Sequence, residues 1–431
     1  KRAMREDTIA GMSVHIARGS KTIFSRAFGL ADAEGGVAAT PHTVYRIGSI
    51  TKQFTAAAVM QLVEQGKLSL DDDFTKYVPE FPARGRRVTI RQLLDHTSGI
   101  RSFNLLGDAW LARSHDERSQ REMIDLIASA PYDFEPGTWW VYSNSGYYLL
   151  GVVIERVSGQ SYADYLRDHV FARAGLTATT YCDERAIIPN RARGYQLIEG
   201  RMVNTLPLSM SQLFAAGAIC STAPDLARWA QALHDGRVVS RQSYEMMATG
   251  ATLADGTRRS YGFAMNVASL LGHRKLEHSG WATGAVSVLV HYPDDSLTIA
   301  ILTNTQPLAV EKIEETMATA ILRTSDSGKE KAPAPVPEVP LTAEAAARFV
   351  GDYALGPVRV SVTAKEGRLV ARARGYPLPW TLAWRGGETF GAVSDPTLRV
   401  VFHVSGAAGE ARADSVTVFQ REGSIRGIRV R

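Results

Sequence analysis

The chain has 431 residues, of which 45% are hydrophobic and 22% charged, and its net charge at pH 7 is +5. One hydrophobic core seldom serves a chain of this length, so two domains are expected. The basic residues are dispersed, with the largest cluster at Arg84-Gly85-Arg86-Arg87, and this pattern predicts no nucleic-acid partner. No apolar run reaches the roughly 18 residues that a membrane span requires.

The chain contains two cysteines, Cys182 and Cys220. Two cysteines exclude a framework of several disulfides, while a single bridge is possible. The sequence begins at Lys1 without a methionine, which is compatible with an export signal removed from the mature protein. We therefore expect a periplasmic or secreted protein, with a cytoplasmic location as the alternative.

The first and last parts of residues 1–325 have the alternation of β-strands, and the middle part is helical by period. Strands are predicted over 12–17, 21–28, 261–267, 285–291 and 297–303. Helices are predicted over 53–65, 147–157, 162–174 and 308–323. This order predicts one sheet assembled from N- and C-terminal segments, plus a helical insertion. A site is expected in the cleft between these parts.

Residues 326–340 differ in composition, because prolines recur at close spacing towards their end. Such a segment favours a semi-rigid linker. From residue 341 to 431, short alternating segments predict a small all-β meander barrel. The predicted strands cover 358–363, 368–373, 379–384, 389–392, 399–404, 415–419 and 425–430. The predicted organisation is a domain over 1–325, a linker over 326–340 and a barrel over 341–431.

The strongest chemical signal is Ser49-Ile50-Thr51-Lys52, at the start of a helical run. Ser49 and Lys52 are three residues apart, so they share one helix face. A neutral serine hydroxyl is a poor nucleophile at pH 7 and needs a neighbouring base, which a lysine in Ser-x-x-Lys supplies. Alone, the motif also fits a capping serine beside a solvated lysine.

Two further motifs lie far along the chain. Tyr142-Ser143-Asn144 lies in a turn-rich stretch before a helical run, and His278-Ser279-Gly280 precedes the apolar run 286–290. Singly, the first is typical of a turn with a capping asparagine and the second of an ordinary surface histidine. Only a large folded domain can bring all three motifs together, and their joint occurrence in this order is informative.

Together the motifs resemble the serine penicillin-recognising hydrolases, in the branch of class C β-lactamases, DD-peptidases, D-aminopeptidases and related esterases. The similarity covers roughly residues 8–325 and includes the segments 44–54, 66–72, 89–100 and 217–226. It implies an α+β fold of the β-lactamase/transpeptidase type, with an antiparallel sheet flanked by helices and a helical subdomain. The C-terminal segment resembles the lipocalin-like domain appended to some of these peptidases.

The resemblance implies a serine hydrolase that works through an acyl-enzyme on Ser49. Lys52 and Tyr142 would share the role of proton acceptor, and the residues leave open which of them is the base. The backbone N–H groups of Ser49 and Trp281 would form the oxyanion hole. Losing one such donor typically reduces the rate by about 10²–10³-fold.

The third motif departs from class C β-lactamases, which have Lys-Thr-Gly where this chain has His278-Ser279-Gly280. Histidine there resembles certain DD-peptidases and D-aminopeptidases. By the resemblance, Asn144, Ser279 and Gly280 would bind substrate, and His278 would assist carboxylate binding or tune Tyr142. With an unperturbed pKa of about 6.5, histidine would be a weak, pH-dependent cation.

We therefore expect a peptidase or amidase acting on small peptides or amides with D-residues. The alternatives are a β-lactamase or carboxylesterase of the same fold, or a non-catalytic penicillin-binding-type receptor or scaffold. No metal or cofactor is expected, since the ten histidines are scattered and no His-Glu-x-x-His motif occurs. An α/β-hydrolase would need Gly-x-Ser-x-Gly, which is absent. The expected partners are a small substrate and, as an open possibility, further copies of the chain.

Overall fold

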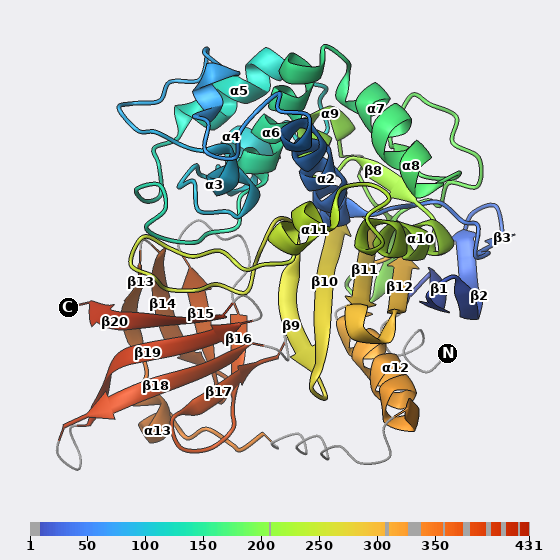
Figure 1. Cartoon of the computed structure of the whole chain (residues 1–431). Helices are drawn as coiled ribbons and strands as arrows, with labels where there is room; N and C mark the ends of the chain where they lie inside the picture. The colour runs from blue at the N-terminus through green and yellow to red at the C-terminus, as the bar shows by residue number, and fades with distance from the viewer. Residues whose placement is uncertain are drawn as a thin grey trace. The chain divides into compact units, whose positions relative to one another are not determined.

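The computed structural model (Figure 1) gives the fold of most of the chain. It describes residues 9–206, 208–306, 310–325, 338–356, 358–373, 380–393, 398–406, 411–420 and 423–430. A seven-stranded antiparallel sheet has the strand order β3-β2-β1-β12-β11-β10-β9. These strands are β1 (Gly11–Arg18), β2 (Lys21–Asp32), β3 (Val37–Ala38), β9 (Asn266–Leu270), β10 (His273–Ala282), β11 (Ala285–Tyr292) and β12 (Leu297–Thr303).

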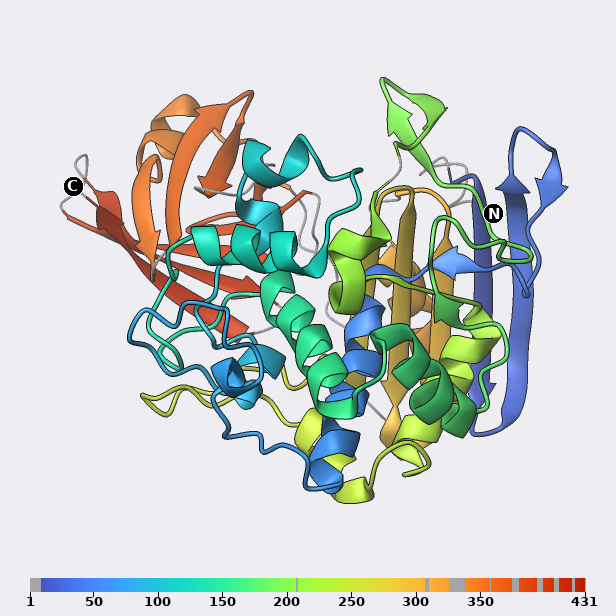
Figure 2. The ribbon, with the colours of Figure 1, turned by 90° about the horizontal axis from the view of Figure 1, so that it is seen from above.

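The two ends of the first 325 residues meet in this sheet. Strand β1 pairs with β12 in antiparallel fashion, with Val14 opposite Ile301, and Figure 2 shows the blue N-terminal strands alongside the orange C-terminal ones. The prediction of one sheet built from both segments is confirmed. The predicted strand over 261–267 is wrong in its bounds, because Gly262 N–H donates to the Met265 carbonyl in a turn and β9 begins only at Asn266.

Helices cover both faces of the sheet. Leu289 and Val290 are neighbours on β11, so their side chains point to opposite faces. Val290 belongs to a buried cluster with residues of α12 (Val310–Ser325). Leu289 lines a cavity shared with α2 (Thr51–Glu64) and α10 (Ala223–His234). Strand β11 is therefore buried along its whole length, as expected for a strand covered on both sides.

The middle of the chain is largely helical, as predicted. Besides α2 and α10 it contains α3 (Ile90–Leu94), α4 (Asp108–Leu111), α5 (Gln120–Ser129), α6 (Asn144–Ser158), α7 (Tyr162–Tyr165), α8 (Ala172–Ala174), α9 (Met210–Leu213) and α11 (Arg241–Met247). A π-helical turn over Leu166–Phe171 joins α7 to α8. No helix among the described ranges combines the length and apolarity needed to cross a bilayer.

Short strands complete this part of the chain. They are β4 (Tyr45–Arg46), β5 (Thr180–Tyr181) and β8 (Ile219–Ser221) in one small sheet, and β6 (Tyr195–Ile198) and β7 (Arg201–Asn204) in a hairpin. A disulfide joins Cys182, directly after β5, to Cys220 in β8. The single bridge that the sequence left possible is therefore present.

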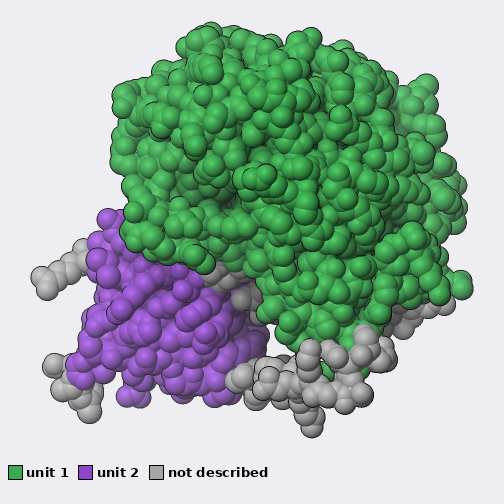
Figure 3. All heavy atoms as spheres, in the orientation of Figure 1, with its two compact units in different colours: residues 1–103, 110–329 green, residues 104–109, 330–431 purple. Residues whose placement is uncertain are grey.

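The described residues divide into two compact units (Figure 3). One lies within 1–103 and 110–329, and the other within 104–109 and 330–431. Most of the predicted linker over 326–340 falls outside the described residues, so its conformation and the domain boundary remain predictions.

The second unit contains a closed antiparallel barrel of eight strands. They are β13 (Gly351–Leu355), β14 (Val358–Lys365), β15 (Arg368–Ala373), β16 (Trp380–Trp384), β17 (Thr389–Ala392), β18 (Arg399–Ser405), β19 (Arg412–Gln420) and β20 (Gly423–Val430). Phe349, Phe390 and Phe402 pack in its core, beside the short helix α13 (Ala343–Ala347). The predicted barrel is confirmed, although β13 was not among the predicted strands.

Candidate active site

Ser49 occupies a 3₁₀ turn over Gly48–Ile50 that continues directly into α2. Lys52 lies in the first turn of α2, and its Nζ donates to Ser49 Oγ at 3.0 Å. Ser49 is partly exposed, whereas Lys52 is fully buried. The structure thus places an accessible hydroxyl against a buried amine within a single turn, as the spacing predicts.

Two further acceptors surround the Lys52 amine. Its Nζ lies 2.8 Å from Asn144 Oδ1, at the start of α6, and 2.7 Å from the carbonyl oxygen of Ala216. Burial lowers the pKa of Lys52 well below its usual value of 10.5. Deprotonation of Lys52 to the neutral amine therefore requires less free energy than deprotonation of an exposed lysine.

Tyr142 immediately precedes Ser143, whose side chain caps α6 by accepting from Gly146 N–H. The Lys52 Nζ lies 4.8 Å from the centroid of the Tyr142 ring. The ring also packs against a buried cluster that includes Trp140 and Tyr261. The first two sequence motifs are therefore brought together around Lys52.

His278 lies inside β10, a strand that the sequence did not predict, on the face that also meets α2 and α10, and it precedes β11 as expected. Its Nδ1 is 2.6 Å from the Ser279 carbonyl oxygen and its Nε2 is 2.7 Å from the Tyr261 hydroxyl. A carbonyl can only accept, so Nδ1 carries the proton and Nε2 accepts from Tyr261. Burial, and then the charge of Lys52, lower the pKa of His278 to about 4. The imidazole is thus neutral at pH 7, contrary to the pH-dependent cation that the sequence suggested.

The backbone of β10 lies directly on the Ser49 turn. A Cβ on Gly280 would collide with the Ile47 carbonyl oxygen, which accepts from Ser287 Oγ at 2.8 Å. A Cβ on Gly48 would lie 2.7 Å from the backbone nitrogen of Trp281. Glycine at both positions therefore allows the strand and the turn to approach this closely. Ser279, between His278 and Gly280, is half-buried.

The pairing of β10 sets the direction of the Trp281 N–H. Trp281 pairs with Val286, one residue from the tight turn that joins Ala282 to Ala285. Val286 N–H points away from β10, because it donates to Thr303 Oγ1 on β12. Trp281 and Val286 therefore form a non-hydrogen-bonded antiparallel pair, in which each N–H points away from the partner strand. The Trp281 N–H is thus directed away from β11, towards the side where Gly48 lies.

Sequence reasoning missed three groups in this assembly: His96, Ala216 and Tyr261. The His96 ring lies 4.3 Å from the Tyr142 ring and 4.9 Å from the Tyr261 ring, between centroids. His96 falls in the segment 89–100 that carried the family resemblance, which was the available signal. Tyr261 and the Ala216 carbonyl had no signal, because their roles depend on contacts made only in the fold.

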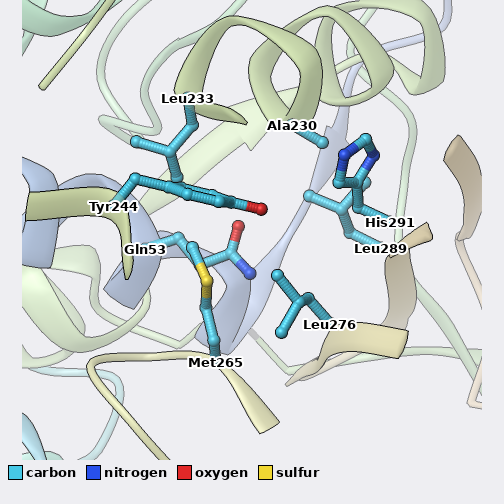
Figure 4. A pocket seen from close by; sticks show the side chains of 8 residues that line it. All are labelled: Gln53, Ala230, Leu233, Tyr244, Met265, Leu276, Leu289 and His291. Atoms are coloured by element: carbon cyan, nitrogen blue, oxygen red, sulfur yellow. The ribbon is translucent and has the colours of Figure 1, made fainter. Parts of the chain in front are cut away.

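A small cavity lies between α2, α10, α11 and the sheet (Figure 4). Its volume of about 20 Å³ suffices for about one water molecule. None of the predicted catalytic or substrate-binding residues is among those that line it, which are Gln53, Ala230, Leu233, Tyr244, Met265, Leu276, Leu289 and His291. Gln53 follows Lys52 on α2, and successive helical residues point in different directions. The cavity is therefore separate from the Ser49 site.

The buried, neutral His278 predicts acid sensitivity. The folded pKa of His278 is about 4 against 6.5 for the free side chain, so the unfolded chain binds more protons as the pH falls below 6.5. The contribution of neutral His278 to the free energy of unfolding should be fully present above pH 6.5. It should decline by about 3 kcal/mol as the pH falls towards 4. Urea unfolding at pH 7.5, 6, 5 and 4 measures the loss.

His278→Gln should reduce that acid-induced loss, since glutamine does not titrate. His42→Gln is the matched control, because His42 is exposed. Equal losses in the wild type and in His278→Gln would contradict the assignment of a neutral, buried imidazole. Asp95 works in the opposite direction, because burial raises its pKa to about 6, so the comparison must be made between variants at each pH.

Comparisons with known proteins agree with this architecture. The family model described as Beta-lactamase matches residues 1–324. Penicillin-binding protein 4* of Bacillus subtilis is 30% identical over 370 residues, which cover 80% of this chain and 79% of that protein.

Solved structures extend the similarity. The octameric penicillin-binding protein homologue from Pyrococcus abyssi has a TM-score of 0.68 and 26% identity, covering 99% of this chain and 97% of that one. The D-stereospecific amidohydrolase from Streptomyces sp. has a TM-score of 0.61 and 27% identity, covering 70% of this chain and 92% of that one. The chain therefore belongs to the Beta-lactamase family and is a serine hydrolase of the β-lactamase and penicillin-binding protein type.

Proposed function

We propose that Ser49 is the nucleophile of an acyl-transfer reaction and that Lys52 accepts its proton. The three contacts of Lys52 Nζ carry this proposal. The Ala216 carbonyl can only accept, and Asn144 presents its Oδ1. The two N–H bonds of a neutral amine satisfy these two oxygens. In the neutral form the contact with Ser49 is therefore reversed, and the nitrogen lone pair accepts from the Ser49 hydroxyl.

In the proposed reaction, Ser49 Oγ attacks the substrate carbonyl carbon while its proton passes to Lys52. The negative charge that develops on the carbonyl oxygen is stabilised by the backbone N–H groups of Ser49 and Trp281. Tyr142, beside Lys52, helps to return the proton to the leaving group. A water molecule then hydrolyses the acyl-enzyme by the same proton transfers in reverse, with Asn144, Ser279 and Gly280 holding the substrate.

We propose that the substrates are small peptides or amides containing D-residues. The similarity to the D-stereospecific amidohydrolase supports this class. The neutral state of His278 supports it further, because the position that carries lysine in class C β-lactamases offers no positive charge here to a β-lactam carboxylate. A carboxylesterase activity is the second candidate, since an ester leaving group needs little help from an acid catalyst.

Covalent labelling and a substrate panel test these proposals. Intact-mass spectrometry should show an adduct on Ser49 with a fluorophosphonate, an activated ester or a β-lactam, and none on Ser49→Ala. D-amino-acid amides, D-alanyl peptides, short p-nitrophenyl esters and nitrocefin are then ranked by kcat/KM. A folded protein that forms no adduct with any reagent overturns the nucleophile. A kcat/KM of about 10⁷ M⁻¹s⁻¹ for nitrocefin, together with no peptide turnover, overturns the proposed substrate class.

We propose that residues 326–340 link two domains, 1–325 and 341–431. Limited proteolysis should cut first in this segment, because it is rich in proline and polar residues. The larger fragment should end near residue 330 and retain Ser49, Lys52, Tyr142 and His278. First cuts between residues 52 and 240 would contradict the boundary.

We also propose export and self-association. The bridge between Cys182 and Cys220 is typical of proteins outside the reducing cytoplasm, which supports a periplasmic or secreted location. The similarity to an octameric homologue over nearly the whole chain supports a homo-oligomer. Light scattering coupled to size-exclusion chromatography measures the number of copies, and a monomer at micromolar concentration would contradict the second proposal.

A further inference from the structure

His96 is buried against Tyr142 and its neighbours. Only 1% of its surface is exposed. The centroid of its ring lies 4.3 Å from that of Tyr142, 4.9 Å from that of Tyr261 and 5.2 Å from that of Tyr147. The imidazole therefore forms one wall of the space that the Tyr142 ring occupies.

The same residue also holds the backbone on both sides of Tyr142. Val141 N–H donates to the His96 carbonyl oxygen at 3.2 Å. Ser143 N–H donates to His96 Nδ1, also at 3.2 Å. The residues on either side of Tyr142 are therefore both bound to His96, Val141 through the His96 backbone and Ser143 through the His96 side chain.

The backbone of His96 is held in an uncommon conformation. Its φ is 64°, in the left-handed region that non-glycine residues adopt uncommonly and where asparagine, aspartate and histidine are the enriched exceptions. The next residue, Thr97, is fixed by its N–H and hydroxyl, which both donate to Asp95 Oδ1. Such local strain persists only where the surroundings enforce it, and it is concentrated at functional sites.

The hydrogen bond from Ser143 also sets the tautomer of His96. Nδ1 must accept, so the neutral ring carries its proton on Nε2. Burial, followed by the charge of Lys52, keeps the pKa of His96 well below 6.5. Nε2 is buried and has no acceptor within hydrogen-bonding distance among the described residues. Leaving such a donor unbound disfavours folding by about 1–3 kcal/mol, so space-filling alone is a poor account of a histidine here.

We propose that His96 is a positioning residue for Tyr142, which aligns the phenol with Lys52 through the Ser143 hydrogen bond and the ring contact. The inference rests on the proposed role of Tyr142 in acyl transfer. Displacing a catalytic group by about 1 Å can reduce a rate by about 10²-fold, which sets the expected size of the effect.

The test compares His96→Asn with His96→Gln. The Asn side chain can place an oxygen where His96 has Nδ1, and asparagine tolerates the left-handed backbone, so Ser143 N–H keeps an acceptor. Gln carries its amide one carbon further out and leaves that N–H without one. The rate of Ser49 labelling by a fluorophosphonate should fall by about 10²-fold in His96→Gln and by much less in His96→Asn. His15→Asn is the matched control, because His15 is buried on β1 and bonded through Nδ1 to Ser25.

A double-mutant cycle separates positioning from general damage to the fold. In a Tyr142→Phe background, adding His96→Gln should change the labelling rate by no more than about twofold, because the group it positions is already gone. An equal loss in both backgrounds overturns the proposal, as do wild-type rates in His96→Gln or equal losses in the Asn and Gln variants. With a p-nitrophenyl ester, kcat should fall while KM holds, and a rise in KM alone would indicate substrate binding instead.

Failure of the underlying mechanism gives a different result. If Tyr142→Phe labels as fast as the wild type, the role of Tyr142 is wrong irrespective of His96. If the wild type is not labelled at all, the nucleophile is wrong. Thermal melting of each variant shows which are folded, and the comparison of the Asn and Gln variants remains decisive if a His96→Ala variant does not fold.

Discussion

Lys52→Met is expected to reduce the rate of Ser49 acylation by about 10⁴-fold, the upper end of what a positioned proton acceptor contributes. Methionine has nearly the volume of lysine but no lone pair on nitrogen to take the Ser49 proton. The loss should appear both in fluorophosphonate labelling and in kcat for p-nitrophenyl esters. Rates of labelling, followed by intact-mass spectrometry, provide the measurement.

Lys52→Arg distinguishes a base from a fixed positive charge. Arginine remains protonated at every accessible pH, so it keeps the charge but cannot accept a proton. The arginine variant should therefore be as inactive as the methionine variant. Activity within about tenfold of the wild type, well short of the expected loss, would show that charge suffices and that Tyr142 or another group is the base.

The stability of Lys52→Met supplies an independent check on the buried amine. The pKa of Lys52 in the folded protein lies well below 10.5. Between that lowered pKa and pH 10.5, the unfolded chain therefore binds more protons than the folded protein. Wild-type stability should decline relative to Lys52→Met as the pH falls from about 10.5 towards the lowered pKa. A pH-independent difference between the two proteins would mean that Lys52 titrates normally in the fold.

Tyr142→Phe is expected to lower kcat/KM by about 10²–10⁴-fold. The substitution removes only the phenol oxygen and retains the ring that lies 4.8 Å from Lys52 Nζ. Tyr165→Phe is the matched control, since the Tyr165 hydroxyl is bound to Gln61 in a buried position away from the motifs. The control should retain nearly full activity.

When two groups act as one unit, the rate losses caused by substituting each of them do not add. The Ser49→Ala/Tyr142→Phe double variant should therefore be no slower than Ser49→Ala alone. If the second substitution multiplies the loss by its own full factor, Tyr142 contributes to something other than the Ser49 reaction, such as the stability of the start of α6.

The sequence by itself determined the local features of this protein. Ser49 and Lys52 are three positions apart, and this spacing alone places their side chains together on one helical turn, without tertiary information. Continuous apolar runs determined β11 and β12, which are buried along their whole length. Alternation of apolar residues determined most of the barrel strands, because side-chain direction in a strand has a period of two. The sequence did not predict β13, because Gly351–Leu355 has no β-branched residue and the strand pairs with β14 and the distant β20.

Tertiary structure decided the electrostatics of the site. His278 is neutral because burial, and then the charge of Lys52, lower its pKa against the opposing effect of the Ser279 carbonyl, and neither influence is written in the motif. The pKa of Lys52 is lowered well below its usual value because the fold buries the amine. Protonation depends on the surrounding dielectric and on partners distant in sequence, whereas periodicity depends only on neighbours along the chain. The sequence can therefore identify the reactive groups, but their charge states follow only from the folded structure.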